Sequence, residues 1–251
     1  MSASRPFVLS IAGFDPTAGA GVLADVKTFE QHQVYGLSII TGNTIQTENE
    51  FQTVEWTPLQ FVLNSIAILF GNYNIKAVKI GIVPSLDHLK SIVDEIRKYS
   101  KEVKIVWDTV LKSSTEFEFI TIENQSDLNG ILDQMDLITP NYNEMLKLVP
   151  QKTTPEEIGQ SLSKHCAVLL KGGHNPGAVG IDYLYTGDEH FSLNPKTITV
   201  MEKHGTGCVL SSAITANLAL NHDLPKSCQK AKLYIEHYLN TNNTLLGYHY
   251  V

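Results

Sequence analysis

The chain has 251 residues, of which 43% are hydrophobic and 18% charged, and its formal net charge at pH 7 is −7. This length and apolar content suit one large core, so we expect a single domain over residues 1–251. The negative net charge and the interspersed charges exclude a nucleic-acid footprint and a surface for anionic membranes. The expected partner is a small molecule.

The amino-terminal residues lack a long apolar stretch behind a basic start, and apolar runs such as Ile66 to Phe70 are too short to cross a bilayer. The three cysteines, Cys166, Cys208 and Cys228, are an odd count without C-x-x-C spacing, which argues against a disulfide framework or a zinc ribbon. We therefore expect a cytoplasmic protein.

The chain opens with an apolar run, Phe7–Ala12, that predicts a buried strand ending at Gly13, then a turn-rich loop and a helix over about Ala20–Gln33. Further strands are predicted at Leu37–Thr41, Ala77–Ile80, Val103–Trp107, Asp136–Thr139 and Ala167–Lys171. Helices are predicted at Leu59–Leu69, Ser85–Lys98, Ser126–Asp133, Asn141–Leu148 and, behind a Thr153/Thr154 cap, Pro155–His165. This alternation predicts a mostly parallel sheet with helices on both faces.

The pattern changes near the end of the chain. Asp182–Tyr185 and His190–Leu193 flank Gly187-Asp188, which predicts an antiparallel hairpin. Two long helices follow, over about Gly207–Asn221 and Pro225–Leu246. We find no repeat, low-complexity tract or linker, which favours one domain.

The segment His204-Gly205-Thr206-Gly207-Cys208 leads into an apolar helix. Its glycines allow a tight turn whose amides, with the helix dipole, suit an anion. Cys208 lies in the first helical turn, where the dipole and His204 are expected to favour the thiolate. A proton acceptor beside a phosphate site indicates a kinase; the alternative is that Cys208 is a small buried residue.

Polar and glycine-rich residues follow the other predicted strands, and we expect them to face one crevice at the carboxyl ends of the strands. They are Gly13, Asp15 and Gly19–Gly21, then Asn43, Thr44 and Gln46, then Asp108, Val110 and Lys112, then Asn141 and Glu144, and finally Lys171, Gly172, Gly173 and His174.

The first loop matches neither a P-loop nor the G-x-G-x-x-G pattern of dinucleotide-binding proteins, which excludes an NAD-dependent dehydrogenase. On the helix behind it, Asp25 would accept hydrogen bonds from an amino group or ring N–H of a ligand. Gln46 suits the edge of a heteroaromatic ring, although a solvated loop glutamine is the simpler interpretation.

Lys171 with Gly172, Gly173 and His174 is a candidate holder of nucleotide phosphates, although a lysine at a strand end is usually just solvated. Asn141 and Glu144 have the spacing of a capping box. Glu144 would also organise water around a magnesium ion that bridges phosphates.

Taken in order, seven segments resemble the hydroxymethylpyrimidine and hydroxymethylpyrimidine phosphate kinases of thiamine biosynthesis, within the ribokinase-like superfamily. The segments are Ile11-Ala12-Gly13-Phe14-Asp15-Pro16, Gly19-Ala20-Gly21, Ala24-Asp25-Val26-Lys27-Thr28-Phe29, Val78-Lys79-Ile80-Gly81, Thr139-Pro140-Asn141, Lys171-Gly172-Gly173-His174 and His204-Gly205-Thr206-Gly207-Cys208. The match covers nearly the whole chain.

The resemblance implies a three-layer α/β sandwich, ATP with Mg2+ as the phosphoryl donor, and a homodimer. It implies a pyrimidine site lined by Gly13, Asp25, Gln46, Ile82 and Val110. ATP and its metal would be served by Asn141, Glu144, Lys171, Gly173 and His174, with Glu144 acting on magnesium through water. Gly205, Thr206 and Gly207 would form an anion hole with Cys208, the general base.

The chain departs from the family pattern at several positions: Ala18-Gly19 in the first loop, Thr47-Glu48, Thr109 in place of proline, and Lys203 in place of threonine. The predicted activity is phosphorylation of 4-amino-5-hydroxymethyl-2-methylpyrimidine and then of its monophosphate. A pyridoxal or pyridoxine kinase and a catalytically idle pyrimidine-binding protein are the alternatives.

Overall fold

In the computed structural model, the described residues are 4–112, 119–122, 124–149, 151–152, 154–174, 177, 179–187, 189–196 and 201–250. Thr153 of the predicted cap and Asp188 of the predicted hairpin lie outside them. The strands are β1 (Phe7–Phe14), β2 (Tyr35–Gln46), β3 (Phe51–Trp56), β4 (Ile75–Ile80), β5 (Lys104–Trp107), β6 (Leu137–Ile138), β7 (Ala167–Leu170), β8 (Asp182–Thr186) and β9 (Glu189–Leu193).

Across the described residues these strands form one nine-stranded sheet in the order β3-β2-β1-β4-β5-β6-β7-β8-β9. The six strands from β2 to β7 in this order pair in parallel, while β3 at one edge and β8 and β9 at the other pair antiparallel. The mostly parallel sheet and the final hairpin are therefore confirmed.

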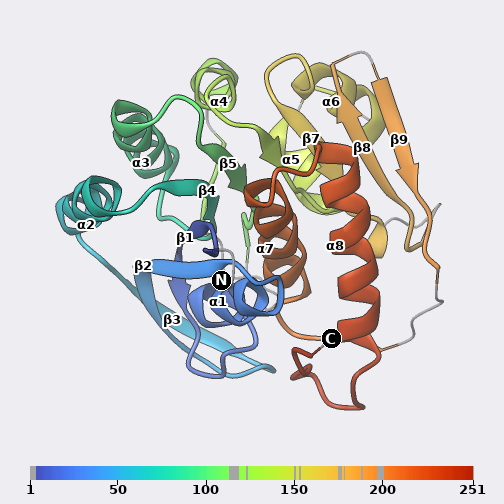
Figure 1. Ribbon diagram of the computed structural model, residues 1–251. Coiled ribbons are helices and arrows are strands. Elements are labelled where there is room, and N and C mark those ends of the chain that lie inside the picture. The colour runs from blue at the N-terminus through green and yellow to red at the C-terminus, as the bar shows by residue number, and fades with distance from the viewer. Residues whose placement is uncertain are drawn as a thin grey trace.

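Helices cover both faces of the sheet (Figure 1). They are α1 (Gly21–Gln31), α2 (Leu59–Asn72), α3 (Leu86–Tyr99), α4 (Gln125–Leu132), α5 (Tyr142–Leu148), α6 (Pro155–Leu162), α7 (Thr206–Ala219) and α8 (Leu224–Leu239). Helices α2 and α3 pack together, as do α3 and α4, whereas α1, α7 and α8 form a second packed group. The result is the predicted three-layer sandwich.

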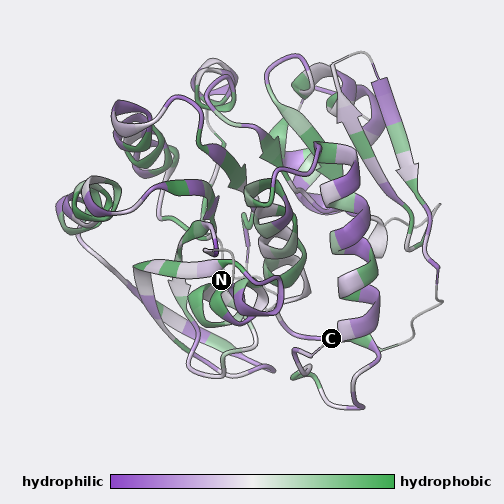
Figure 2. Cartoon of the chain, viewed as in Figure 1, coloured by the Kyte–Doolittle hydropathy of each residue, from purple (hydrophilic) through white to green (hydrophobic). Residues whose placement is uncertain are grey.

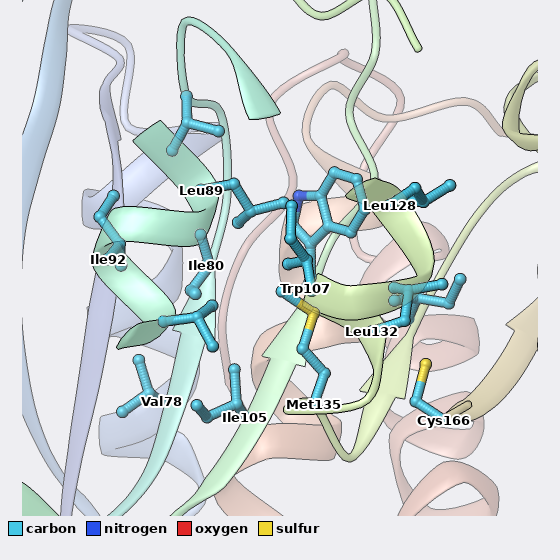
Figure 3. Packing of buried hydrophobic residues seen from close by; sticks show 14 of the residues in the cluster. Val78, Ile80, Leu89, Ile92, Ile105, Trp107, Leu128, Leu132, Met135 and Cys166 are labelled. Carbon is cyan, nitrogen blue, oxygen red and sulfur yellow. The ribbon is translucent and has the colours of Figure 1, made fainter. Parts of the chain in front are cut away.

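The larger apolar core lies between the sheet and the layer that contains α2, α3 and α4. Figure 3 shows its centre, where the Trp107 ring lies among side chains such as Leu89 and Leu128. Apolar residues line the sheet and the inner sides of helices in Figure 2. Helix α7 is buried at every position from Val209 to Ala219, so it lacks the polar face of a surface helix.

Two expectations about the elements are wrong. Strand β3 was not predicted, and Asn43, Thr44 and Gln46 lie inside a longer β2, paired with β3, instead of following the strand. Helix α8 ends at Leu239, not at Leu246, because the polar run that begins at Asn240 contains poor helix formers. No helix among the described residues is long and apolar enough to cross a membrane.

Candidate active site

The loop after β1 packs directly against the amino terminus of α7. Gly205, the residue before the first helical turn, has a φ of 73°, and a Cβ added there would lie 1.9 Å from the carbonyl oxygen of Gly19. Gly21 has a φ of 61°, and a Cβ there would lie 2.2 Å from the carbonyl oxygen of Gly13. A side chain at Gly205 would push the first loop away from α7, and one at Gly21 would push the start of α1 away from the end of β1, so both positions require glycine.

Asp15 fastens the two loops together. Its carboxylate accepts hydrogen bonds from His204 Nε2 at 2.9 Å, from the Thr17 hydroxyl at 2.8 Å and from the Ala20 amide at 2.8 Å. Burial alone would raise the pKa of Asp15, but these hydrogen bonds, with His204 the strongest, bring it below its ordinary value. His204 is therefore a partner of Asp15, and its ring bridges the first loop to α7.

Cys208 lies in the first turn of α7 as predicted, but its protonation differs from the expectation. Burial raises the pKa of the Cys208 thiol to about 11, and the carboxylates of Asp108 and Asp25 add to this, while Lys79 and a hydrogen bond from the Gly21 amide oppose it. The expected thiolate beside His204 is therefore wrong, because His204 pairs with Asp15 and burial outweighs the cation and the helix amides.

Lys171 and Asp108 form an ion pair against the amino terminus of α7. Lys171 Nζ donates to Asp108 Oδ1 at 3.1 Å, and the same carboxylate accepts from Thr139 and, through Oδ2, from Ser211 of α7. A Cβ added at Gly207 would lie 3.3 Å from Lys171 Nζ. The cation therefore lies next to the amides that would hold a phosphoryl group, and it is not a solvated strand-end lysine.

Asn141 and Glu144 form the capping box that their spacing predicts. The Glu144 amide donates to Asn141 Oδ1 at 2.9 Å, and the Asn141 amide donates to Glu144 Oε2 at 2.7 Å. Lys171 Nζ lies 3.8 Å from the same Oε2. Burial raises the pKa of Glu144 to about 7, a shift that Lys171 opposes and Asp108 increases. The Glu144 carboxyl group thus caps α5 and also lies beside the ion pair of Lys171 and Asp108.

Asp25 lies on α1 with no exposed surface, among donors from three other elements. Its carboxylate accepts from Ser10 at 2.5 Å, from Lys79 at 2.9 and 3.0 Å, and from Ser212 at 2.7 Å. These bonds occupy its acceptor positions, so a ligand would bind Asp25 only by displacing one of them.

Lys79 belongs to the segment Val78-Lys79-Ile80-Gly81, in which the sequence alone predicts no role for it. Burial would lower its pKa, but the Asp25 carboxylate, together with Cys208 and Asp108, outweighs burial and raises it. The available signal was a lysine inside an apolar strand, because a buried ammonium needs a charged partner.

The candidate substrate residues come from neighbouring strand ends. A Cβ added at Gly13 would lie 2.5 Å from Ile82 Cδ1, so these two residues are in direct contact. Gln46 Nε2 donates to Thr44 Oγ1 at 2.9 Å, and Thr44 in turn donates to the carbonyl of Phe14, the neighbour of Gly13. Val110 follows Asp108, whose carbonyl accepts from the Val110 amide at 2.7 Å.

Gly173 lies in a short 3-10 turn (Gly172–His174), and a Cβ added there would meet no atom within 4 Å. The side chain of His174 lies outside the described residues. Within the described part of the chain, no three His, Cys, Asp or Glu side chains gather as a metal cage.

A family model described as phosphomethylpyrimidine kinase matches residues 15–250. The hydroxymethylpyrimidine/phosphomethylpyrimidine kinase of Aquifex aeolicus (strain VF5) is 35% identical over 246 residues, which are 94% of this chain and 95% of that protein. The protein of the same name from Escherichia coli (strain K12) is 32% identical over 245 residues, 94% of this chain and 92% of its own.

Two solved structures have the same fold. The phosphomethylpyrimidine kinase of Clostridium difficile 630 superposes with a TM-score of 0.77 at 30% identity, covering 93% of this chain and 99% of that one. An ADP complex of Bacillus subtilis pyridoxal kinase gives a TM-score of 0.80 at 26% identity, covering 94% and 92%.

Proposed function

Because the chain belongs to the phosphomethylpyrimidine kinase family, we propose that it phosphorylates 4-amino-5-hydroxymethyl-2-methylpyrimidine and then the resulting monophosphate, with ATP as the donor. The products are the monophosphate and then the diphosphate used for thiamine synthesis. The observation that carries this proposal is the amino terminus of α7, which presents the backbone of residues 205–208 beside the Lys171–Asp108 pair.

In the first step the hydroxymethyl oxygen forms a bond to the γ-phosphorus while the bond from that phosphorus to the β,γ-bridging oxygen breaks. ADP leaves, and the alcohol proton passes to a base. Such transfers depend mainly on alignment and charge neutralisation. The amides of Gly205, Thr206 and Gly207 and the ammonium of Lys171 would supply these.

Cys208 is the proposed proton acceptor. With a pKa of about 11 it is mostly a thiol at neutral pH, so only a small fraction of the enzyme holds the thiolate at any time. The loose transition state of phosphoryl transfer places little demand on the base before the bond to phosphorus forms. The ammonium of Lys79, which lowers the pKa of Cys208, would stabilise the thiolate when it forms.

For ATP and its metal we propose Asn141, Glu144, Lys171, Gly173 and His174. Bound magnesium would neutralise charge on the transferring phosphates. Glu144 is suited to hold a water molecule bound to the magnesium ion, because its carboxyl group lies 3.8 Å from Lys171 Nζ. Its pKa is about 7, so above pH 7 at least half of the molecules carry the ionised carboxylate. Lys171 would exchange part of its pairing with Asp108 for the phosphate oxygens.

For the pyrimidine we propose a site lined by Gly13, Asp25, Gln46, Ile82 and Val110. The contact between Gly13 and Ile82 gives an apolar surface for a ring, and Gln46 supplies an amide that both donates and accepts. Asp25 would reach the amino group of a ring only by releasing Ser10 or Ser212.

We also propose a homodimer in the cytoplasm, built from one domain per chain. Helix α2 exposes Phe61 at 65% and Ile68 at 66%, and an apolar outer face of this kind is typical of an interface. The three cysteines are free, in keeping with a reducing compartment. Light scattering of the purified protein and of Ile68→Glu tests the dimer; a monomeric wild type would overturn it.

A pyridoxal kinase is the second candidate, favoured by the TM-score of 0.80 to the Bacillus subtilis pyridoxal kinase. The test is to incubate the protein with ATP, magnesium and either the pyrimidine alcohol or pyridoxal, and to identify products by mass. We expect pyrimidine monophosphate and diphosphate to form faster than pyridoxal phosphate. The reverse preference would support the second candidate, and no transfer to either alcohol would overturn both.

A further inference from the structure

Lys203 stands directly before the loop that forms the proposed anion hole, and its ammonium is buried. Only 7% of the residue is exposed. Its Nζ donates to the carbonyl of Asn242 at 2.6 Å, to Asn242 Oδ1 at 3.0 Å and to the carbonyl of Thr244 at 2.5 Å. All three acceptors belong to the segment that follows α8, near the end of α7 that carries Cys208 (Figure 1).

The same segment, residues 241–246, contacts the site loops at two further points. The His204 amide donates to the carbonyl of Leu245 at 2.9 Å. A Cβ added at Gly19 would lie 2.8 Å from Leu246 Cδ2 and 2.7 Å from His204 Cδ2, so Leu246 packs where the first loop meets His204. The segment therefore covers both loops that meet at Gly205.

Lys203 also connects the segment to the first turn of α7. Its carbonyl accepts a hydrogen bond from Thr206 Oγ1 at 2.6 Å. On the other side, Asn242 Oδ1 accepts from the Thr244 amide, and Asn242 Nδ2 donates to the carbonyl of Leu246. The ammonium is thus the centre of a hydrogen-bonded unit that runs from the segment to Thr206.

We propose that Lys203 is a positioning residue for phosphoryl transfer, which fastens segment 241–246 to the anion-hole loop and so fixes the amides of Gly205, Thr206 and Gly207. This inference rests on the proposed kinase function. Lys203 itself touches no reacting atom in this scheme; it acts through Thr206 and His204. Because small displacements of a catalytic group lower kcat steeply, loosening the loop lowers turnover more than substrate binding.

The variant Lys203→Met keeps the stem and removes the ammonium. We expect kcat to fall at least about tenfold while KM for the pyrimidine stays within about twofold, and hydrogen exchange to quicken in residues 204–208 and 241–246. Arg97→Met is the matched control. Arg97 also donates to backbone carbonyls, those of Gln134, Lys101 and Val103, but it lies beside the start of β5, the end opposite to the site. It should lower the melting temperature without lowering kcat.

A second variant keeps the test valid if Lys203→Met does not fold. Asn242→Ala removes the side-chain acceptor from the segment, and it should reproduce the loss of kcat. The double variant should lose no more than the stronger single one, since both break one unit. Wild-type kcat in either folded variant, or an equal loss in Arg97→Met, would overturn the role of Lys203, whereas a wild type without transfer would overturn the proposed function itself.

Discussion

Lys171 Nζ lies 3.1 Å from Asp108 Oδ1, and the same carboxylate accepts hydrogen bonds from Thr139, after β6, and from Ser211 of α7. Burial would raise the pKa of Asp108, but Lys171 and Lys79 lower it, so the carboxylate stays charged. The ion pair keeps a cation beside Gly207 before any phosphate arrives. Its orientation is therefore set in advance of binding, which is the condition for efficient charge stabilisation.

Replacing this lysine is expected to impair transfer severely. Lys171→Met should lower kcat/KM for ATP by about 10²–10³, because the phosphates lose a preorganised cation and Asp108 is left as an unpaired buried charge. Steady-state kinetics with a melting curve separates the two effects. Lys104→Met, which removes an exposed lysine paired with Asp136, should leave kcat/KM unchanged. Equal activity of Lys171→Met and wild type would refute the phosphate role.

The raised pKa of Cys208 predicts how turnover depends on pH. If the thiolate accepts the alcohol proton, kcat rises as pH increases from 7 toward 10, because the thiolate fraction grows toward a pKa of about 11. Cys208→Ala should lower kcat by ~10²–10⁴ and flatten the profile, with KM for the pyrimidine nearly unchanged. Cys228→Ala, at a buried free cysteine of α8, is the control. A flat wild-type profile would assign proton removal elsewhere.

Much of the fold follows from the sequence because buried parallel strands are short apolar runs. Two examples are Ala77–Ile80 and Ala167–Lys171, which contain mostly apolar side chains. The first lies within β4, and the second overlaps β7. Strand β3, with the sequence Phe-Gln-Thr-Val-Glu-Trp, is an edge strand without a fully buried residue, so it carries no such run. Its pairing with β2 depends on contacts that local periodicity does not encode.

The candidate site was predictable where it depends on local backbone. Gly205 and Gly21 were recognisable from their loops, and the capping box of Asn141 and Glu144 from its spacing. The charge pairs were not, because Lys79 and Asp25 are 54 positions apart and His204 and Asp15 are 189 apart. Burial, which raises the pKa of Cys208 most, also depends on how the distant segments pack, so the position of Cys208 was predicted correctly and its protonation was not.

Glu144 makes stability depend on pH in a direction opposite to that of an ordinary salt-bridged carboxylate. Its pKa is about 7 in the folded chain against a reference value of 4.5, so between these pH values the native state holds a proton that the unfolded state has lost. The free energy of unfolding therefore falls as pH rises from about 5 to 7. Denaturant melts of Glu144→Gln should show a smaller fall than wild type.

The control for this measurement is Glu157→Gln, at an exposed position in the first turn of α6. It should keep the wild-type dependence of the unfolding free energy on pH. If Glu144→Gln and Glu157→Gln give the same slope, Glu144 is ionised throughout this range and its assignment as a neutral, buried carboxyl group below pH 7 is wrong.

Two glycine-to-alanine changes separate the packing of the site from the general effect of a methyl group. Gly205 has a φ of 73°, and a Cβ added there would lie 1.9 Å from the carbonyl oxygen of Gly19. The substitution Gly205→Ala must therefore push the first loop away from α7. At Gly130 in α4 an added Cβ meets nothing within 4 Å, and alanine should stabilise the helix by about 0.5–1 kcal/mol. We expect Gly205→Ala to lose nearly all phosphoryl transfer and Gly130→Ala to retain it.

Because Asp15 and His204 bridge the same two loops, the loss in Gly205→Ala should be accompanied by faster hydrogen exchange at residues 15–21. An active Gly205→Ala enzyme would mean that the close approach of the two loops is dispensable for transfer.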